Sequence, residues 1–526
     1  MLNNLYEAFR HEGHLSRRLI LAYAASLSAI PLLGKASGTP KKVSFSSDPF
    51  SLGVASGDPD HESVILWTRL APKPLEKGGG MPDVPVEVLW EIAEDPEFKK
   101  TTHSGKVTAT STLGFSVHIE AQNLKPDHWY YYRFHSGDAT SPPGRTRTLP
   151  HPDSDPRNLR FAVTSCQRWE DGYFTAYQQM VQDKPDFVFH LGDYIYEYAT
   201  RTGLIRETQG PELNTLDQYR NRYSQYRTDK DLQAIHAACP WFLTWDDHEF
   251  DNNCASDISE QKNILAADFL LRRANAYQAY YEMMPLRPAS LPKGPDMQLY
   301  RKGRFGRLAE FYILDTRQYR SDQPNNDEKS PLNDAAFNPR NTLLGDTQRE
   351  WLFKSMSESK GTWNVLAQQV MMALVDRDPR PEIDRYSMDQ WPGYADERTK
   401  VLEFVRDRKI SNAVVLTGDI HSNWANELRI DDRFTDTSII ATEFVATSLT
   451  SGGNGNKTVK SLEALYSENA CTKFHNQERG YLLCDLTPET YTTDYKVIEE
   501  VEKPGGITVS RAKFTVEAGQ PKIHPS

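Results

Sequence analysis

Four apolar runs in the sequence each end on residue types that bind metal ions in proteins. The runs are FAVTSC, DFVFHLGDYIY, FLTWDDHE and AVVLTGDIH. Each has the length and the Val, Phe and Leu content of a strand buried in a parallel sheet. Open α/β sheets bind ligands beyond the carboxyl ends of their strands, so the pattern predicts that these ends converge on one metal centre. The residues concerned are Cys166, Asp193, Tyr196, Asp246, Asp419 and His421.

Strands alternate with amphipathic helical patterns throughout residues 158–526, which predicts an α/β domain. The further elements expected in it are a long helix at 261–284 and strands at 308–314 and 363–368. Within the helix, Tyr277, Tyr280 and Tyr281 fall at i, i+3 and i+4. That spacing places them on one face, where we expect them to pack against the sheet.

The preceding part of the chain, residues 49–149, predicts an all-β sandwich. It contains short alternating runs such as SVILWTRL, VEVLWEIA and YYYRFHS, and it lacks a helical period. The sequence LKP followed by Tyr130 is similar to the tyrosine corner of immunoglobulin-like and fibronectin-type sandwiches. Trp67, Trp90 and Trp129 are expected in the sandwich core. The polar segment HPDSDPR is predicted to be the linker between the two domains.

Residues 1–36 resemble a bacterial signal peptide. Ser16-Arg17-Arg18 precedes an apolar stretch, and Gly34-Lys35-Ala36 offers a cleavage site after Ala36. The paired arginines favour the twin-arginine export route, which carries folded proteins. A general secretory signal and an amphipathic first helix remain alternatives. The expected location is therefore the periplasm or the extracellular space, with the export machinery as a partner.

Composition narrows the classes of partner. The 526 residues suggest two domains, and a hydrophobic content of 38% with 25% charged residues is normal for a soluble protein. The net charge of −11 gives no diffuse attraction for nucleic acid or for an anionic membrane. No specific nucleic-acid binding is expected. An anionic substrate would need local positive charge, which a bound metal supplies.

Five cysteines in an exported chain allow two disulfides and one free thiol. Cys239 with Cys254 and Cys471 with Cys484 are possible pairs. Cys166 is left over at a strand end, where it is either a small buried hydrophobe or a metal ligand. The other three strand ends favour the ligand.

The donor types indicate two different cations. A phenolate from Tyr196 and a thiolate from Cys166 favour ferric iron over calcium or magnesium, because tyrosine has a pKa near 10 and sulfur is a soft ligand. Asp193 lies three residues before Tyr196 and can bridge both ions. His421 would complete the iron side. The hard oxygen ligands of a second, calcium-like ion would be Asp246, Asn253 and Asp419.

The motifs GDYIYEY, WDDHEFDNN and GDIHSNW resemble the PhoD family of alkaline phosphatases, a branch of the metallophosphoesterases. SLGVASGDP with ILWTRLAP is similar to the N-terminal sandwich of that family, and LDTRQYRSDQ with LLGDTQREWL to its later motifs. The resemblance implies a metallophosphoesterase-like sheet sandwich flanked by helices, preceded by an immunoglobulin- or fibronectin-like domain. It also implies an iron and calcium centre that hydrolyses phosphate monoesters and diesters at alkaline pH.

Carried onto this chain, the resemblance assigns Cys166, Asp193, Tyr196 and His421 to Fe(3+), and Asp193, Asp246, Asn253 and Asp419 to Ca(2+). Asp247 is the alternative to Asp246. The commoner metallophosphoesterase signature has an aspartate and a histidine where this chain has Ser165-Cys166, and GNH where it has DDH. These differences argue against an ordinary two-zinc or two-manganese enzyme.

The predicted activity is hydrolysis of small-molecule phosphate esters by a metal-activated hydroxide or oxide. His248 is a candidate proton donor to the leaving group, or else a hydrogen-bonding histidine beside the ligands. Arg317 is favoured over Arg168 and Arg227 for binding phosphate oxygens. A phospholipase D-like enzyme acting on lipid or polymer phosphodiesters is an alternative, and so is an envelope binding protein with structural metals.

Overall fold

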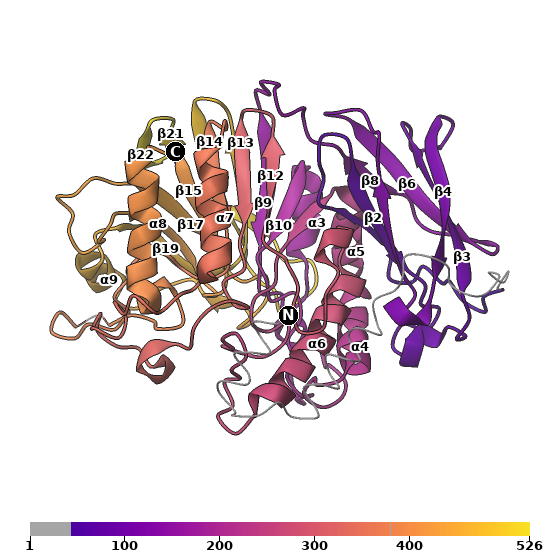
Figure 1. Ribbon diagram of the computed structural model, residues 1–526, viewed down its shortest axis with the longest axis horizontal. Coiled ribbons are helices and arrows are strands. Elements are labelled where there is room, and N and C mark those ends of the chain that lie inside the picture. Colours follow the sequence, from indigo (N-terminus) through magenta and orange to yellow (C-terminus); the bar gives the residue numbers. More distant parts are fainter. Residues whose placement is uncertain (1–43, 379) are drawn as a thin grey trace.

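The computed structural model describes residues 44–378 and 380–526, so the predicted signal peptide at 1–36 lies outside the described residues. Across the described residues, no helix combines the length and apolar character that crossing a membrane requires. The chain forms an N-terminal sandwich lobe and a larger α/β lobe that lie side by side (Figure 1).

The N-terminal lobe has two β layers around an apolar core. The outer layer has the order β4-β3-β6, with β7 and β8 both paired to β6. The inner layer has the order β5-β2-β1. The strands are β1 (Val54–Gly57), β2 (Val64–Arg69), β3 (Val86–Ala93), β4 (Thr101–Ala109), β5 (Ser116–Ala121), β6 (Trp129–Ser136), β7 (Ala139–Thr140) and β8 (Gly144–Arg147). Val64, Val88 and Tyr132 fill the space between the layers.

Two details bear on the expectations for this lobe. The Tyr130 hydroxyl accepts a hydrogen bond from the backbone N–H of Lys125 at 2.9 Å, which is the contact that the LKP and Tyr130 pattern suggests. The tryptophan prediction is wrong for Trp67, which belongs to the core of the α/β lobe and donates its indole N–H to the Glu282 carbonyl at 2.8 Å. Trp90 and Trp129 are only partly buried.

The first sheet of the α/β lobe continues the inner layer of the sandwich. β1 pairs in parallel with β11 through Gly57 and Trp241. The sheet then runs β11-β10-β9-β19-β20-β21-β22, parallel from β11 to β9 and antiparallel afterwards. Its strands are β9 (Leu159–Thr164), β10 (Phe187–His190), β11 (Trp241–Leu243), β19 (Thr472–Leu486), β20 (Thr490–Ile498), β21 (Thr508–Glu517) and β22 (Gln520–Pro525).

The second sheet has the order β12-β13-β14-β15-β17-β16 and is parallel from β13 to β17. Its strands are β12 (Arg301–Phe305), β13 (Ala309–Ile313), β14 (Trp363–Ala367), β15 (Ala413–Thr417), β16 (Asn423–Leu428) and β17 (Ala441–Val445). The start of β19 pairs with β16 and its end pairs with β9, so one strand belongs to both sheets. The short β18 (Gly455–Asn456) also pairs with β19. The strands expected at 308–314 and 363–368 are present as β13 and β14.

The two sheets face each other across an aromatic core and carry helices on their outer faces (Figure 1). Phe161, Phe187 and Phe311 lie in that core, with the rings of Phe161 and Phe187 stacked 5.4 Å apart. The helices on the first sheet are α3 (Ala176–Asp183), α4 (Leu216–Arg227), α5 (Lys230–Ala238) and α6 (Ala266–Met283). Those on the second sheet are α7 (Gly345–Ser357) and α8 (Ala395–Asp407), and α9 (Leu462–Glu468) precedes β19.

Helix α6 corresponds to the helix expected at 261–284, but it begins at Ala266 because the chain before it forms turns. Tyr277 stacks on Trp245 at 4.1 Å, and Tyr280 meets the same ring edge-on. The face that the sequence assigned to packing is therefore the buried one.

The possible disulfides do not form, and all five cysteines are buried free thiols. Cys471 packs on the outer side of the second sheet, whereas Cys484 lies between the sheets. A sheet thus separates their side chains, which a sequence spacing cannot show.

Candidate metal centre

The polar residues that follow β9, β10, β11 and β15 meet at one edge of the paired sheets. Cys166 follows β9, Asp193 follows β10, and Asp419 and His421 follow β15. These four residues have positive φ angles, of 56°, 54°, 62° and 55° respectively. Non-glycine residues rarely adopt this conformation, and it costs about 1–3 kcal/mol at each position. Such strain, concentrated in four residues at three strand ends, is typical of a functional site.

One group of donors matches the predicted iron side. The ligand atoms of Cys166, Asp193 and His421 all lie within 4.8 Å of one another. The Tyr196 hydroxyl lies 2.8 Å from Oδ2 of Asp193 and 3.2 Å from Nε2 of His421. The structure therefore brings together the four side chains named for iron.

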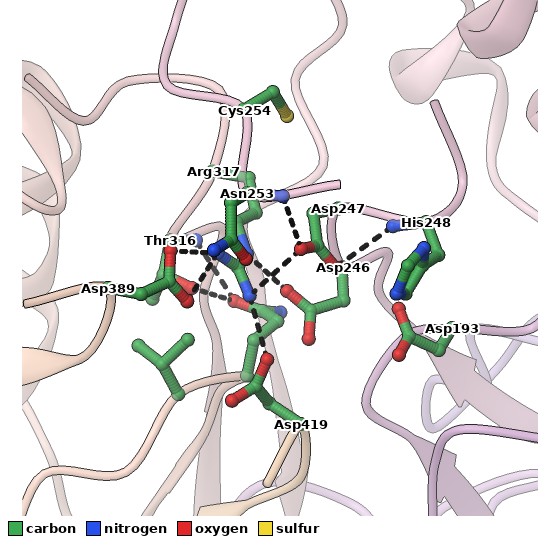
Figure 2. A network of polar contacts seen from close by, with 12 residues as sticks. Asp193, Asp246, Asp247, His248, Asn253, Cys254, Thr316, Arg317, Asp389 and Asp419 are labelled. Carbon is green, nitrogen blue, oxygen red and sulfur yellow. Dashed lines mark hydrogen bonds and ion pairs between the residues drawn. The ribbon is translucent and has the colours of Figure 1, made fainter. Parts of the chain in front are cut away.

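A second group contains the carboxylates. Ligand oxygens of Asp246, Asp247 and Asp419 lie within 4.8 Å of one another, so both aspartates of the DDH sequence face the centre. Figure 2 shows them around the guanidinium of Arg317. Asn253 lies beside this group; its backbone N–H donates to Asp247 at 2.7 Å, and its side-chain amide donates to Asp327 at 2.6 Å.

The electrostatics of these acids favour bound cations. Burial, and then the neighbouring carboxylates, raise the pKa of Asp246 and Asp419 above its usual range in spite of Arg317, and raise that of Asp247 to about 7. Burial also raises the pKa of Asp193, but the charges of His248 and His421 outweigh it and leave that pKa low. Further positive charge is needed to keep the whole group ionised at neutral pH.

Unpaired carboxylate oxygens at the site also favour bound cations. Within the described residues, Oδ1 of Asp193 and Oδ2 of Asp246 are buried and have no hydrogen-bond partner. A buried carboxylate oxygen without a partner is costly, and a cation removes that cost. Burial and the charge of Asp193 raise the pKa of Cys166 and Tyr196, so a cation would also be needed to hold them as thiolate and phenolate. The residues present therefore fit the implied metals.

His248 lies beside both groups. Its Nδ1 is 2.8 Å from Oε2 of Glu197, and its ring centroid is 4.2 Å from that of Tyr196. Burial lowers the pKa of His248, but the charges of Glu197 and Asp193 outweigh it and raise the pKa well above the ordinary value.

The three arginines considered for phosphate binding occupy different environments. Arg317 is fully buried and donates to Asp246, to Asp389 at 3.0 Å and to Asp419 at 2.9 Å, so acids of the protein take up its guanidinium. Arg227 lies over the ring of Trp67 at 4.2 Å, between the lobes. Arg168 lies over the rings of Tyr196 and Tyr198, at 5.6 and 5.3 Å, with its nearest acids at 3.6 and 3.8 Å.

Three residues of the site were missed by the sequence reading. Asp389 binds Arg317 from a loop without a periodic pattern (Figure 2). The Ser451 hydroxyl lies 2.7 Å from the Tyr196 hydroxyl and 2.7 Å from the Cys166 carbonyl. Glu197 alone had a signal, since it stands inside the GDYIYEY motif.

Comparisons with known proteins agree with this geometry. Residues 161–495 match the PhoD-like phosphatase family, and residues 35–150 match the N-terminal domain of PhoD-like phosphatases. Alkaline phosphatase D of Bacillus subtilis (strain 168) is 50% identical over 481 residues, which cover 90% of this chain and 82% of that protein. A solved structure of PhoD superimposes with a TM-score of 0.89 at 48% identity, covering 92% of this chain and 93% of that one. The chain therefore belongs to the PhoD-like phosphatase family and is a phosphoric ester hydrolase.

Proposed function

We propose that the chain is an exported phosphatase that works with one ferric ion and calcium. The observation that carries the proposal is the convergence of a thiol, a phenol, an imidazole and several carboxylates within a few ångströms. Bound cations at such a site neutralise the phosphate and lower the pKa of a coordinated water. The side chains that would hold iron are Cys166, Asp193, Tyr196 and His421, and those around calcium are Asp193, Asp246, Asn253 and Asp419, with Asp247 as the alternative to Asp246.

In this proposal His248 gives a proton to the departing alkoxide. Glu197 holds Nδ1 of the imidazole at 2.8 Å, which fixes the ring and leaves Nε2 to act on the substrate. Arg317 neutralises the buried acids instead of binding phosphate. Arg168 takes the phosphate role, because its guanidinium lies beside Tyr196 and forms only two longer ion pairs, with Glu170 at 3.6 Å and Asp171 at 3.8 Å.

The substrates proposed are small-molecule phosphate monoesters and diesters at alkaline pH. Phospholipase D-like action on lipid or polymer phosphodiesters is the second candidate. The two facing sheets flanked by helices support a metallophosphoesterase-like architecture, and the Tyr130 to Lys125 contact supports an immunoglobulin- or fibronectin-like sandwich. The arginine pair in the signal-like segment supports export to the periplasm or beyond.

Metal analysis of the purified protein together with its visible spectrum tests this proposal. A phenolate bound to ferric iron absorbs visible light by charge transfer, so we expect coloured protein that contains iron and calcium. Tyr196→Phe should remove the colour and sharply lower turnover, while Tyr198→Phe, at a neighbouring ring, should keep the colour. Colourless wild-type protein that carries only zinc would overturn the metal assignment.

A further inference from the structure

Two of the site loops approach each other very closely. Gly192 has a φ of +106°, and a Cβ atom there would overlap the backbone nitrogen of Asp246. The loop after β10, which carries Asp193, and the loop after β11, which carries Asp246, are thus in backbone contact. The spacing of the two aspartates therefore depends on the contacts that join these loops.

The side chain of Glu249 links the two loops by hydrogen bonds. Its Oε2 accepts hydrogen bonds from the backbone N–H of Asp193 at 3.0 Å and of Asp246 at 2.7 Å. Its Oε1 accepts a third from the N–H of Tyr194. Glu249 is 1% exposed, and main-chain N–H groups are the hydrogen-bond partners recorded for its side chain within the described residues.

Burial and the charge of Asp193 raise the pKa of Glu249, while its three backbone hydrogen bonds act in the opposite direction. In either protonation state, one oxygen of Glu249 bonds the backbone of two candidate ligands. Asp193 also has a strained φ of 54°, a conformation that persists only when the surroundings hold it. Among the described residues, the hydrogen-bond partners of Glu249 are main-chain N–H groups. Its contacts serve the geometry of the two loops.

We propose that Glu249 is a positioning residue that fixes the relative placement of Asp193 and Asp246 and thereby sets the affinity of the centre for its cations. This inference rests on the proposed metal function. Glu249 itself belongs to none of the candidate metal-binding groups among the described residues, and its Oε2 already accepts two backbone hydrogen bonds.

Glu397 provides a control for the loss of a buried carboxylate that binds backbone. It is also 1% exposed and accepts backbone N–H groups, from Leu343 and from Leu344 at 3.0 Å. Unlike Glu249 it also pairs with Arg349 at 2.7 Å. The loop that it holds carries none of the candidate ligands, so Glu397→Gln reports the cost of weakening such a carboxylate, its ion pair included, away from the metal centre.

The experiment compares the wild type, Glu249→Gln, Glu249→Asp and Glu397→Gln after removal of metal with a chelator. Calcium chloride is titrated into each protein by calorimetry, and the melting temperature is measured with and without calcium. We expect both Glu249 variants to bind calcium roughly 10–100-fold more weakly, as substitutions behind metal ligands usually do, and to show a smaller rise in melting temperature on calcium addition. Glu397→Gln should lower the melting temperature and keep the wild-type affinity.

Wild-type calcium affinity in Glu249→Gln, whatever its melting temperature, would overturn the inference. If Glu249→Gln does not fold, Glu249→Asp decides alone, since it keeps the carboxyl group and shortens its reach. Wild-type affinity in that variant has the same meaning. A wild-type protein that binds no calcium would instead refute the proposed metal function, and this inference with it.

Discussion

His248 and Glu197 form a carboxylate–imidazole pair, with Nδ1 and Oε2 2.8 Å apart, beneath the ring of Tyr196. Glu197 also accepts the backbone N–H of Asn252 at 3.2 Å, so the carboxylate is fixed on both of its oxygens. The imidazole therefore has one nitrogen held by the protein and one directed to the site. This is the arrangement that proton donation to a leaving group requires.

The leaving-group dependence of turnover tests that role. His248→Gln should lower kcat for an alkyl phosphate by about 100- to 10,000-fold, the usual contribution of general acid catalysis. The loss should be much smaller for p-nitrophenyl phosphate, because p-nitrophenolate departs without a proton. Glu197→Gln should show the same selectivity with a smaller loss. Equal losses for both substrates would show that His248 acts in some other way.

Arg168 is expected to contact the substrate phosphate. Arg168→Met should raise KM for a phosphate ester and weaken inhibition by inorganic phosphate, each roughly 10- to 100-fold, as the loss of a charged hydrogen bond predicts. Arg201→Met is the matched control. Arg201 also lies over the ring of Tyr198, at 5.5 Å, whereas Arg168 lies over the rings of both Tyr198 and Tyr196. An equal rise in KM in both variants would show that the effect comes from the loss of one positive charge and not from a contact with the phosphate.

Gly192 should tolerate no side chain. In Gly192→Ala, the new methyl group meets the Asp246 backbone and adds strain at a positive φ, so we expect a loss of about 2–4 kcal/mol in the free energy of unfolding. Gly203→Ala has a similar φ of +79° but no atom within 4 Å, and it should lose only about 1 kcal/mol. Urea unfolding measures both. Similar losses in the two variants would mean that contact with the Asp246 backbone adds nothing to the cost of a side chain at position 192.

His118 should make stability depend on pH. The side chain is partly exposed, but both of its ring nitrogens are buried. The ring stacks on Tyr281 of α6 at 4.5 Å, and burial lowers the pKa of His118 to about 4 from 6.5. A lowered histidine pKa means that the unfolded chain binds the proton more tightly, so stability is complete above pH 6.5 and falls as the pH approaches 4. The loss amounts to about 3 kcal/mol at pH 4.

His118→Phe should keep the stacking and remove that part of the pH dependence. The check is the free energy of unfolding of both proteins between pH 7.5 and 4. If the two curves run parallel, the acid sensitivity of the fold comes from other groups.

The sequence predicts well those features that a strand imposes on its own residues. An apolar run of four to eight residues marks β9, β10 and β15, and parallel strands present their carboxyl ends on one edge, so Cys166, Asp193 and Asp419 could be placed together in advance. The same reasoning explains the buried face of α6, since a helical period fixes which side chains share a side.

The features that were missed depend on contacts between distant segments. Asp389 lies in a long loop without a period. Ser451 contacts the Tyr196 hydroxyl and the Cys166 carbonyl, and Glu249 binds backbone N–H groups of two loops, which no residue pattern reveals. The apolar run of β2 indicates that Trp67 is buried, but it does not show which of the two cores Trp67 joins. Arg317 was expected to face the substrate, but the surplus of buried acids attracts its guanidinium.

The contact between Gly57 of β1 and Trp241 of β11 makes the two lobes share a hydrogen-bonded border. If the two lobes were produced as separate fragments, each would expose an unpaired strand edge, which could pair with another chain. The sandwich thus extends a sheet of the α/β lobe, and the two lobes should melt in a single transition.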